Sequence, residues 1–348
     1  MQAIAFDGFG GPEVLRIREV PIPEPTGAEV RVAVRAAAVN PSDWKIRCGA
    51  LSFGDDCFPQ FPGWEIAGVV DALGPEAHGL AIGDPVFGWT RAGGYAEYAL
   101  SRSLARKPEE LSWTAAAALP IAVNTAVKAL DLLELQRGET LLINGASGAV
   151  GSMAAQLAVA AGVTVVGTAA AGNQELVRSF GAAATTYGPG LADRVWALAP
   201  RGVDAVLDVA QHGGLGAAIA LRGGADRIVA LADFSAAQLG VTSAAPHGID
   251  AVFDAVQRGK AATGPGRLGA RPPAVVDFSA AWLGVTDVCG LTGPGVVRLA
   301  GQVAELVCRG VLRLPGPARS FPLAQAARAH HEMEHGHGPG KVVLVLDQ

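Results

Sequence analysis

The sequence predicts an α/β protein in which a compact β-rich region precedes a doubly wound parallel sheet. Three observations predict this class. Residues 1–110 are rich in β-branched and turn-forming residues, helical and strand-like segments alternate from Ala115 onward, and a glycine-spaced turn joins an apolar strand to a small-residue helix at residues 139–151. A length of 348 residues is sufficient for about two domains.

The β-rich region contains short apolar segments that glycine and proline interrupt. The expected strands are Ala3–Phe6, Glu29–Ala38, Ile66–Leu73, Pro85–Trp89 and Tyr95–Leu100. Because this region has no long helical run, it is predicted to form a β-rich domain of its own.

From Ala115 onward, helical and strand-like segments alternate. The expected helices are 115–133, 152–161, 173–180 and 213–221, and the expected strands are Thr140–Asn144, 163–167, Ala205–Asp208 and Arg227–Ala232. Such alternation is typical of a doubly wound parallel sheet. A last helix, Leu323–His335, and a last strand, Lys341–Asp347, are expected to return to the first domain.

The turn after Thr140–Asn144 predicts a cofactor site. Its spacing is A-x-G-x-x-G, with Ala146, Gly148 and Gly151 at the marked positions and Ser147 inside the turn. Backbone N–H groups and a helix N-terminus converge at such a turn and bind a pyrophosphate. The alternative is an ordinary tight strand-to-helix turn, but the strand before it and the βαβ length after it favour the cofactor site.

The end of the next strand bears on the choice of cofactor. Enzymes that use NAD place Asp or Glu about 20 residues after the turn to bind the ribose 2′-hydroxyl. The corresponding stretch here runs from Thr168 and Ala169 to Gly172 and contains no carboxylate. A 2′-phosphate would therefore not be repelled, which favours NADPH.

Composition excludes several classes of partner. The net charge of −5 is small and unsegregated, so no nucleic acid or acidic membrane surface is indicated, and a small-molecule substrate is expected. We see no signal peptide at the start, and the apolar stretch Met153–Ala171 is predicted to be a buried helix and strand rather than a membrane span. Four cysteines without a C-x-x-C pair favour reduced thiols and a cytoplasmic location.

Several motifs together resemble a known family. They are Asn40–Gly49, Phe61–Gly68, Gly83–Gly88, Gly93–Tyr98, Asn124–Ala126, the glycine turn, Phe180–Ala182 and Gly340–Leu344. In this order the chain resembles a zinc-free member of the medium-chain dehydrogenase/reductase superfamily, of the NADPH:quinone oxidoreductase type. The resemblance implies a GroES-like catalytic domain at residues 1–121 and 291–348, a Rossmann cofactor domain at 122–290, and a homodimer.

Two departures from the zinc-dependent branch predict that no metal is bound. Asn40 and Trp64 stand where zinc alcohol dehydrogenases carry a cysteine and a histidine, and neither replaces those ligands. A literal H-E-x-x-H at His331–His335 could place two histidines on one helix face. We interpret it as the histidine-rich end of a helix rather than a metalloprotease site, because no further ligand is identifiable.

The resemblance also implies cofactor contacts by position. They are Pro41, Thr125, Lys128, Ala149, Val150, Asn173, Tyr187, Val209, Leu231, Ala232 and Lys341. Asn173 replaces the family's phosphate-binding lysine, so the 2′-phosphate would be held less strongly unless Arg178 turns inward. Arg178 is otherwise expected on a solvated helix face, and Val209 is otherwise expected to be a core residue.

Catalysis is expected from the segment that follows Glu29–Ala38. Hydride addition to a quinone, an enone or a polyketide-like intermediate leaves an oxygen anion, which needs a hydrogen-bond donor. Asn40 is a predicted donor, Lys45 a predicted donor or proton source, Trp44 a predicted substrate wall, and Asp43 a predicted structural acceptor in a loop cap. Trp64 is expected either to line the same cleft or to fill the space that the metal site would occupy. Many relatives have tyrosine in place of Trp44, so the alternative is an NADP(H)-binding protein of the same fold without redox turnover.

An internal repeat distinguishes the chain. Asp233–Thr242 recurs 44 positions later as Asp277–Thr286 with nine of ten residues identical. We interpret residues 243–286 as an insertion that includes the second copy. The first copy is expected to follow the cofactor strand, and the second to continue into the edge that forms the dimer.

Overall fold

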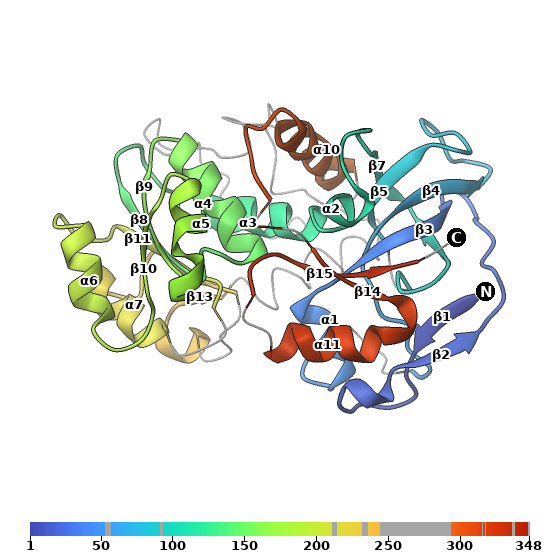
Figure 1. Cartoon of the computed structure of the whole chain (residues 1–348), viewed down its shortest axis with the longest axis horizontal. Helices are drawn as coiled ribbons and strands as arrows, with labels where there is room; N and C mark the ends of the chain where they lie inside the picture. The colour runs from blue at the N-terminus through green and yellow to red at the C-terminus, as the bar shows by residue number, and fades with distance from the viewer. Residues whose placement is uncertain are drawn as a thin grey trace. The chain divides into compact units, whose positions relative to one another are not determined.

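The computed structural model describes residues 1–52, 57–90, 93–210, 214–231, 236–243, 294–314, 316, 318–335 and 338–346 (Figure 1). The chain divides into two compact units. The first comprises Met1–Ile121, Gly293–Leu312 and Gly316–Gln348, and the second comprises Ala122–Thr292 and Arg313–Pro315.

A seven-stranded sheet forms the centre of the first unit within its described residues. Its strands are β3 (Val30–Val39), β4 (Glu65–Leu73), β5 (Pro85–Trp89), β6 (Tyr98–Ser101), β7 (Ser103–Arg106), β14 (Arg319–Pro322) and β15 (Val342–Val345). They follow the order β14-β15-β3-β4-β5-β7, with β6 also paired to β3. Strand β15 pairs antiparallel with β3, which confirms that the end of the chain returns to the first domain.

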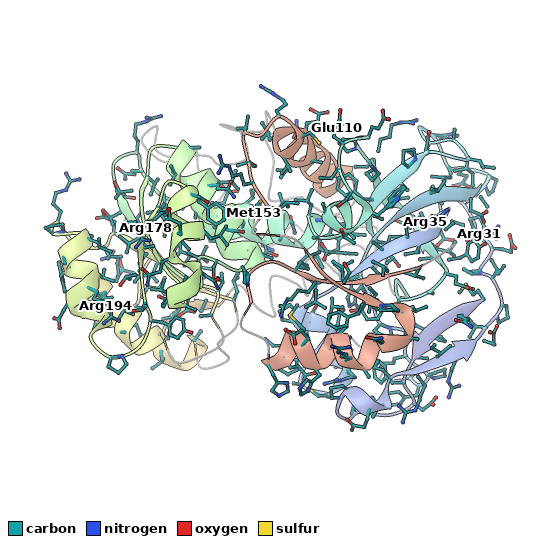
Figure 2. The ribbon with its side chains drawn as sticks, in the orientation of Figure 1. Arg31, Arg35, Glu110, Met153, Arg178 and Arg194 are labelled. Atoms are coloured by element: carbon teal, nitrogen blue, oxygen red, sulfur yellow. The ribbon has the colours of Figure 1, made fainter. Side chains whose placement is uncertain are left out.

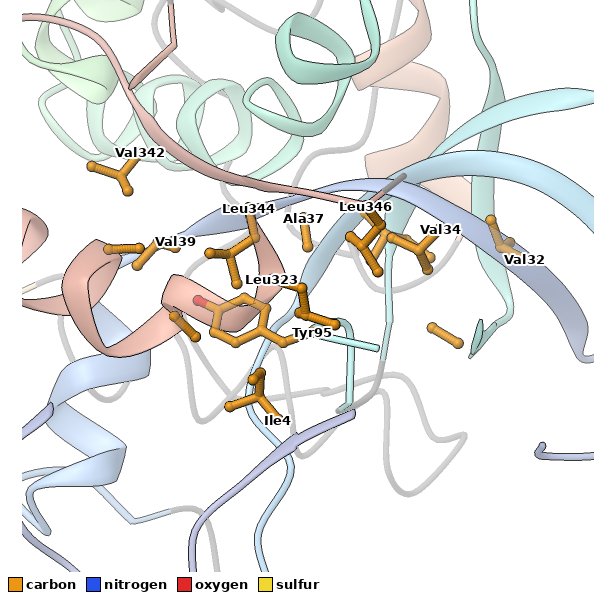
Figure 3. Close-up of a cluster of buried hydrophobic side chains, with 14 of the residues drawn as sticks. Ile4, Val32, Val34, Ala37, Val39, Tyr95, Leu323, Val342, Leu344 and Leu346 are labelled. Atoms are coloured by element: carbon orange, nitrogen blue, oxygen red, sulfur yellow. The ribbon is translucent and has the colours of Figure 1, made fainter. Parts of the chain in front are cut away.

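The remaining elements of this unit surround the sheet. They are β1 (Gln2–Ala5), β2 (Arg16–Glu19), α1 (Pro41–Arg47), α2 (Trp113–Ala117), α10 (Pro294–Cys308) and α11 (Ala326–His335), with 3-10 turns at Pro12–Val14 and Leu323–Gln325. Figure 3 shows the core, in which the Tyr95 ring lies among the side chains of Ile4, Val39 and Leu323. This burial fixes α1 and α11 near the carboxyl end of β3, and these helices contribute Asp43, Arg47 and His330 to the polar cluster described below.

The second unit is a parallel sheet with helices between its strands. Its elements are α3 (Pro120–Leu132), β8 (Thr140–Asn144), α4 (Ala149–Ala160), β9 (Thr164–Thr168), α5 (Gln174–Ser179), β10 (Ala183–Thr185), α6 (Leu191–Leu198), β11 (Ala205–Asp208), α7 (Leu215–Arg222), β12 (Ile228–Ala230) and β13 (Thr242–Ser243), with 3-10 turns at Ala171–Asn173 and Ala236–Leu239. The strand order β10-β9-β8-β11-β12-β13 is the doubly wound order 3-2-1-4-5-6. The predicted parallel sheet is thus confirmed.

Several expected elements differ from the observed ones. The single helix expected at 115–133 is two helices, because Pro120 lacks a backbone donor and begins α3 as a first-turn residue. The sequence interpretation missed β2, whose four residues are exposed and give no hydrophobic alternation. It also missed the short strands β7 and β10 and the helices α1 and α6.

The membrane-like stretch Met153–Ala171 consists of the buried part of α4 followed by β9, as predicted. Another described stretch, Trp113–Leu132, is long and apolar enough to cross a membrane by composition. It is broken at Pro120, and 67% of its most apolar 18-residue window is buried inside the protein, which is typical of core helices.

The first copy of the repeat leads into the sheet. Its residues Ala236–Leu239 form a 3-10 turn, and Thr242 begins β13, which pairs in parallel with β12. The second copy and the insertion beyond Ser243 lie outside the described residues. The role expected for the second copy therefore stays a prediction.

Candidate active site

The glycine turn has the geometry of a phosphate-binding loop. Gly145 has φ +87°, and its N–H donates to Thr168 Oγ1 at 3.1 Å. A Cβ on Gly151 would lie 2.3 Å from Gly145 O, so only glycine lets α4 pack this closely against the turn. The first helical bond at this end of α4 runs from Ser152 N–H to Gly148 O. The N–H groups of Ala149, Val150 and Gly151 precede it and are oriented for an anion, so the loop fits the pyrophosphate of a dinucleotide.

The turn lies where the strand order reverses, between β8 and β11. At this point Asn144 Nδ2 donates to Asp208 Oδ2 at 3.1 Å, and the Val209 N–H donates to Asn144 O. Both side chains are buried. Ligands of doubly wound sheets bind outside the carboxyl ends of the strands at this switch point, so Asn144 and Asp208 support the floor of the expected cofactor site.

The carboxyl end of β9 is where the sequence predicts the ribose site. Thr168 is 1% exposed and its hydroxyl supports the turn, while the Ala169 N–H donates to Thr185 O at 3.0 Å. Asn173 is half-buried and Tyr187 is 60% exposed. Arg178 does not turn inward: it is exposed and donates to Glu175 and Gln174 of its own helix. The expectation of a solvated helix face is therefore confirmed for Arg178.

The other predicted cofactor residues are distributed as follows. Ala146 is buried, Ser147 and Gly148 are half-buried, and Thr125 and Lys128 are half-buried on α3. Val209 and Leu231 are half-buried at the carboxyl ends of β11 and β12. Pro41 is the exposed first residue of α1, and Ala232 lies outside the described residues.

Asn40 and Lys341 meet in a buried network of the first unit. Asn40 Nδ2 donates to Glu65 Oε2 at 2.8 Å, and Lys341 Nζ donates to Asn40 Oδ1 at 2.6 Å and to Glu65 Oε2 at 3.1 Å. Glu65 Oε1 accepts the backbone N–H of Ile121. The structure thus gives both residues protein partners that the sequence interpretation did not expect. One of the two Asn40 amide hydrogens is engaged with Glu65, and the Lys341 ammonium neutralises that carboxylate.

Asp43 caps α1, as predicted. Its Oδ2 accepts the Asn40 N–H at 2.7 Å and the Tyr95 hydroxyl at 2.7 Å. Burial raises the pKa of Asp43 to about 7, although both hydrogen bonds favour the charged form. Burial, and next the nearby Asp43, raises the pKa of Tyr95 well above its ordinary value, so Tyr95 remains a hydrogen-bond donor.

Trp44 and Lys45 follow Asp43 on α1. The Lys45 ammonium lies 5.8 Å from the centre of the Trp44 ring. Lys45 is 7% exposed, and burial lowers its pKa from the ordinary lysine value. A less basic ammonium gives up its proton more readily, which suits the predicted donor role. Trp64 is half-buried, and its carbonyl accepts the Thr90 N–H.

The sequence interpretation missed four residues of this cluster. Glu65 and Tyr95 lie in quoted motifs but received no role, although a carboxylate opening the apolar stretch 65–70 is a signal of a buried polar contact. Arg47 and His330, on α1 and α11, gave no comparable signal. Arg47 is 1% exposed and donates to Glu334 at 2.7 Å, and His330 is fully buried with its ring edge-on to Tyr95 at 5.8 Å.

His330 predicts a pH dependence of stability. Burial, together with the charge of Arg47, lowers the pKa of His330 to about 3. In the unfolded chain this histidine binds a proton near pH 6.5, whereas in the folded chain it stays neutral until about pH 3. The free energy of unfolding therefore decreases as the pH falls from 6.5 towards 3. Relative to a His330→Phe variant, the unfolding free energy of the parent should decrease by up to about 1.4 kcal/mol per pH unit between pH 5.5 and pH 4.

Denaturant titrations at several pH values measure this difference. Met333→Leu, a volume-conserving change on the same helix that removes no titrating group, should keep the pH slope of the parent. Parallel pH profiles of the parent and His330→Phe would show that the buried imidazole accepts a proton in the folded protein.

The H-E-x-x-H motif lies at the end of α11. His331 and His335 lie on α11 with their ring centres 4.4 Å apart, and His335 Nδ1 is 3.1 Å from the carbonyl of His331. Glu332 pairs with Arg319, and the described residues contain no group of three metal-binding side chains. The interpretation as a helix end is consistent with these contacts.

Comparisons with known proteins agree with this architecture. Family models for the alcohol dehydrogenase GroES-like domain and for zinc-binding dehydrogenase match residues 26–109 and 190–344. This chain is similar to the solved structure of the quinone oxidoreductase from Coxiella burnetii, with 28% sequence identity and a TM-score of 0.75. The match covers 100% of this chain and 99% of the Coxiella burnetii chain. The chain belongs to the medium-chain dehydrogenase/reductase superfamily. Its predicted GroES-like and Rossmann folds are confirmed.

Two curated relatives in this superfamily have similar sequences. Human quinone oxidoreductase is 41% identical over 174 residues, and the Arabidopsis thaliana NADPH-dependent alkenal/one oxidoreductase, chloroplastic, is 36% identical over 196 residues. These alignments cover 49% and 52% of this chain, and they span about half of each relative, 53% and 51%. Superfamily membership fixes the fold, whereas the activity and the substrate belong to the proposal below.

Proposed function

We propose that the protein is an NADPH-dependent reductase that transfers hydride to a quinone or to the C=C bond of an α,β-unsaturated carbonyl, without a metal. The observation that carries this proposal is the phosphate-binding turn next to a ribose edge without a carboxylate. The names of the two curated relatives, one a quinone and one an alkenal/one oxidoreductase, support both substrate classes. When bound, the nicotinamide supplies the hydride.

The protein must orient the substrate and stabilise the oxygen anion that hydride addition produces. Lys45, with its lowered pKa, is the proposed donor to that oxygen, and the second amide hydrogen of Asn40 is a further one. The Trp44 and Trp64 rings are the proposed apolar walls. Trp44 has no dissociable hydroxyl, so protonation of the carbon is assigned to Lys45 or to water.

A screen of substrate classes tests this proposal. NADPH oxidation should accelerate with quinones or with enones, and Lys45→Met should lower kcat by roughly 10²-fold or more, the usual range for one lost proton donor. Arg102→Met, which removes an exposed cation of the first unit, is the control. NADPH binding without turnover of quinones, enones or enoyl thioesters would favour the alternative of a cofactor-binding protein without redox activity.

Metal removal gives an independent prediction. Because Asn40 and Trp64 occupy the two ligand positions, dialysis against a strong chelator should leave activity and melting temperature unchanged. The metal content of the purified protein should be far below one zinc per chain. Stoichiometric zinc, with activity lost on its removal, would contradict the metal-free mechanism.

We also propose that the protein acts as a cytoplasmic homodimer on a small molecule, with no nucleic-acid or membrane partner. The small net charge supports the choice of partner, and the exposed, unpaired cysteines Cys48, Cys57 and Cys308 support a reducing location. Light scattering coupled to gel filtration measures the mass in solution.

A further inference from the structure

Arg194 binds one loop through several hydrogen bonds. It lies half-buried on α6, and its Nε donates to Thr185 Oγ1 at 3.2 Å. Its two terminal nitrogens donate to the carbonyls of Pro189 at 2.8 Å and Thr186 at 3.0 Å, with longer contacts of 3.4 Å to the carbonyls of Tyr187 and Gly188. Arg194 is labelled in Figure 2. The planar guanidinium thus holds the whole segment 185–189 in one conformation.

This segment leaves the sheet beside the expected ribose site. β10 pairs in parallel with β9, and Thr185 is opposite Thr168. The carboxyl ends of parallel strands lie at the same edge of a sheet. A hydrogen bond from Ala169 N–H to Thr185 O joins the ends of β9 and β10 there. Residues 186–189 therefore lie next to the stretch that begins at Ala169, where a dinucleotide places its adenosine ribose.

Basic side chains are few in the segment that forms this edge. Residues 168–198 contain two basic side chains, Arg178 and Arg194. Arg178 is exposed and bonded to Glu175 and Gln174 of its own helix, and residue 173 is a neutral asparagine. Arg194 is bonded only to neutral oxygens in the contacts given above, so its positive charge is not cancelled by a carboxylate there.

We propose that Arg194 is a positioning residue that gives this protein its specificity for NADPH over NADH. It fixes the segment 186–189, including the exposed Tyr187 side chain, beside the ribose 2′-phosphate and supplies a fixed positive charge there. This inference rests on the proposed use of NADPH. It extends that proposal by naming a residue that favours NADPH, whereas the lack of a carboxylate at residues 168–172 only removes a repulsion.

Dissociation constants measured by calorimetry test the inference without turnover. Arg194→Ala should weaken NADPH binding by roughly 10-fold, because a charge and the loop conformation are lost together, and NADH binding should change by less than about 2-fold. Arg194→Lys keeps the charge but not the planar fork, so its NADPH affinity should lie between those of the parent and Arg194→Ala. Arg201→Ala is the matched control, since this exposed arginine precedes β11 and so lies at the amino ends of the strands, away from the carboxyl ends that hold the expected ribose site.

A double-mutant cycle with Tyr187→Ala separates positioning from general stability. If Arg194 acts through the loop that carries Tyr187, the NADPH losses of the two single variants should add to more than the loss of the double variant. Equal weakening of NADPH and NADH by Arg194→Ala, unchanged NADPH binding, or strictly additive losses would overturn the inference. NADH binding at parental affinity also shows that the variants are folded. A parent that binds NADH as tightly as NADPH would refute the proposed cofactor itself, and that result is read from the parent alone.

Discussion

Replacing Ala169 by Asp should reverse the cofactor preference from NADPH to NADH. Ala169 follows the last residue of β9, where NAD-dependent proteins of this fold place the carboxylate that binds the ribose 2′-hydroxyl. A carboxylate about 4 Å from a 2′-phosphate near a protein surface is repelled by it with an energy of several kcal/mol. We expect the ratio of the NADPH and NADH dissociation constants to change by about 100-fold or more. Fluorescence titration with both cofactors measures this ratio.

Two further variants make the result interpretable. Ala169→Asn has nearly the same shape as Asp without its charge, so it should retain the NADPH preference. Because Ala169 is only 2% exposed, Asp there could disturb packing, and the half-buried neighbour gives a second position, Ala170→Asp. A preference for NADPH that survives in folded forms of both Asp variants would contradict this location of the ribose.

Replacing Lys341 by Met should strongly destabilise the first unit. The change leaves the Glu65 carboxylate, which is fully buried, without the ammonium that neutralises it. Removing one partner of a buried ion pair costs about 3–5 kcal/mol, because the remaining charge stays out of water. The unfolding free energy from denaturant titration should fall by that amount.

The controls for Lys341→Met distinguish the effect of the unpaired Glu65 carboxylate from the effect of lost packing. The double variant Lys341→Met/Glu65→Gln should recover part of the loss, since it removes the uncompensated charge. Arg106→Met breaks the exposed pair with Asp84 and should cost no more than about 1 kcal/mol. A loss below about 1 kcal/mol for Lys341→Met would show that water reaches Glu65 in the folded protein.

Much of the fold could be predicted from sequence because its patterns are local. Strands Thr140–Asn144, Pro85–Trp89 and Ala205–Asp208 match the predicted ranges, since each is an apolar run between turn-forming residues. β2 could not be found this way, because its side chains are exposed and its pairing with β1 is a tertiary effect. The division of residues 113–132 into two helices follows from Pro120, which cannot donate the backbone hydrogen bond of a helix interior.

In the candidate site, too, local features could be predicted and long-range contacts could not. Backbone features such as the glycine turn follow from spacing, and the turn has the expected geometry. The network of Asn40, Glu65 and Lys341 joins residues up to 301 positions apart, and no local pattern predicts which buried groups satisfy one another. The same reason explains why Arg47, His330 and the loop contacts of Arg194 emerged only from the structure.

Direct hydride transfer from NADPH to a carbon of the acceptor can be followed by isotopic labelling. NADPH carrying deuterium at the transferred position of C4 should be incubated with an enone and the protein, and the product examined by NMR and mass spectrometry. We expect one deuterium at the β-carbon of the saturated ketone, with none incorporated there from D₂O solvent when unlabelled NADPH is used. A product that lacks the label, or no product while NADPH is bound, would contradict it.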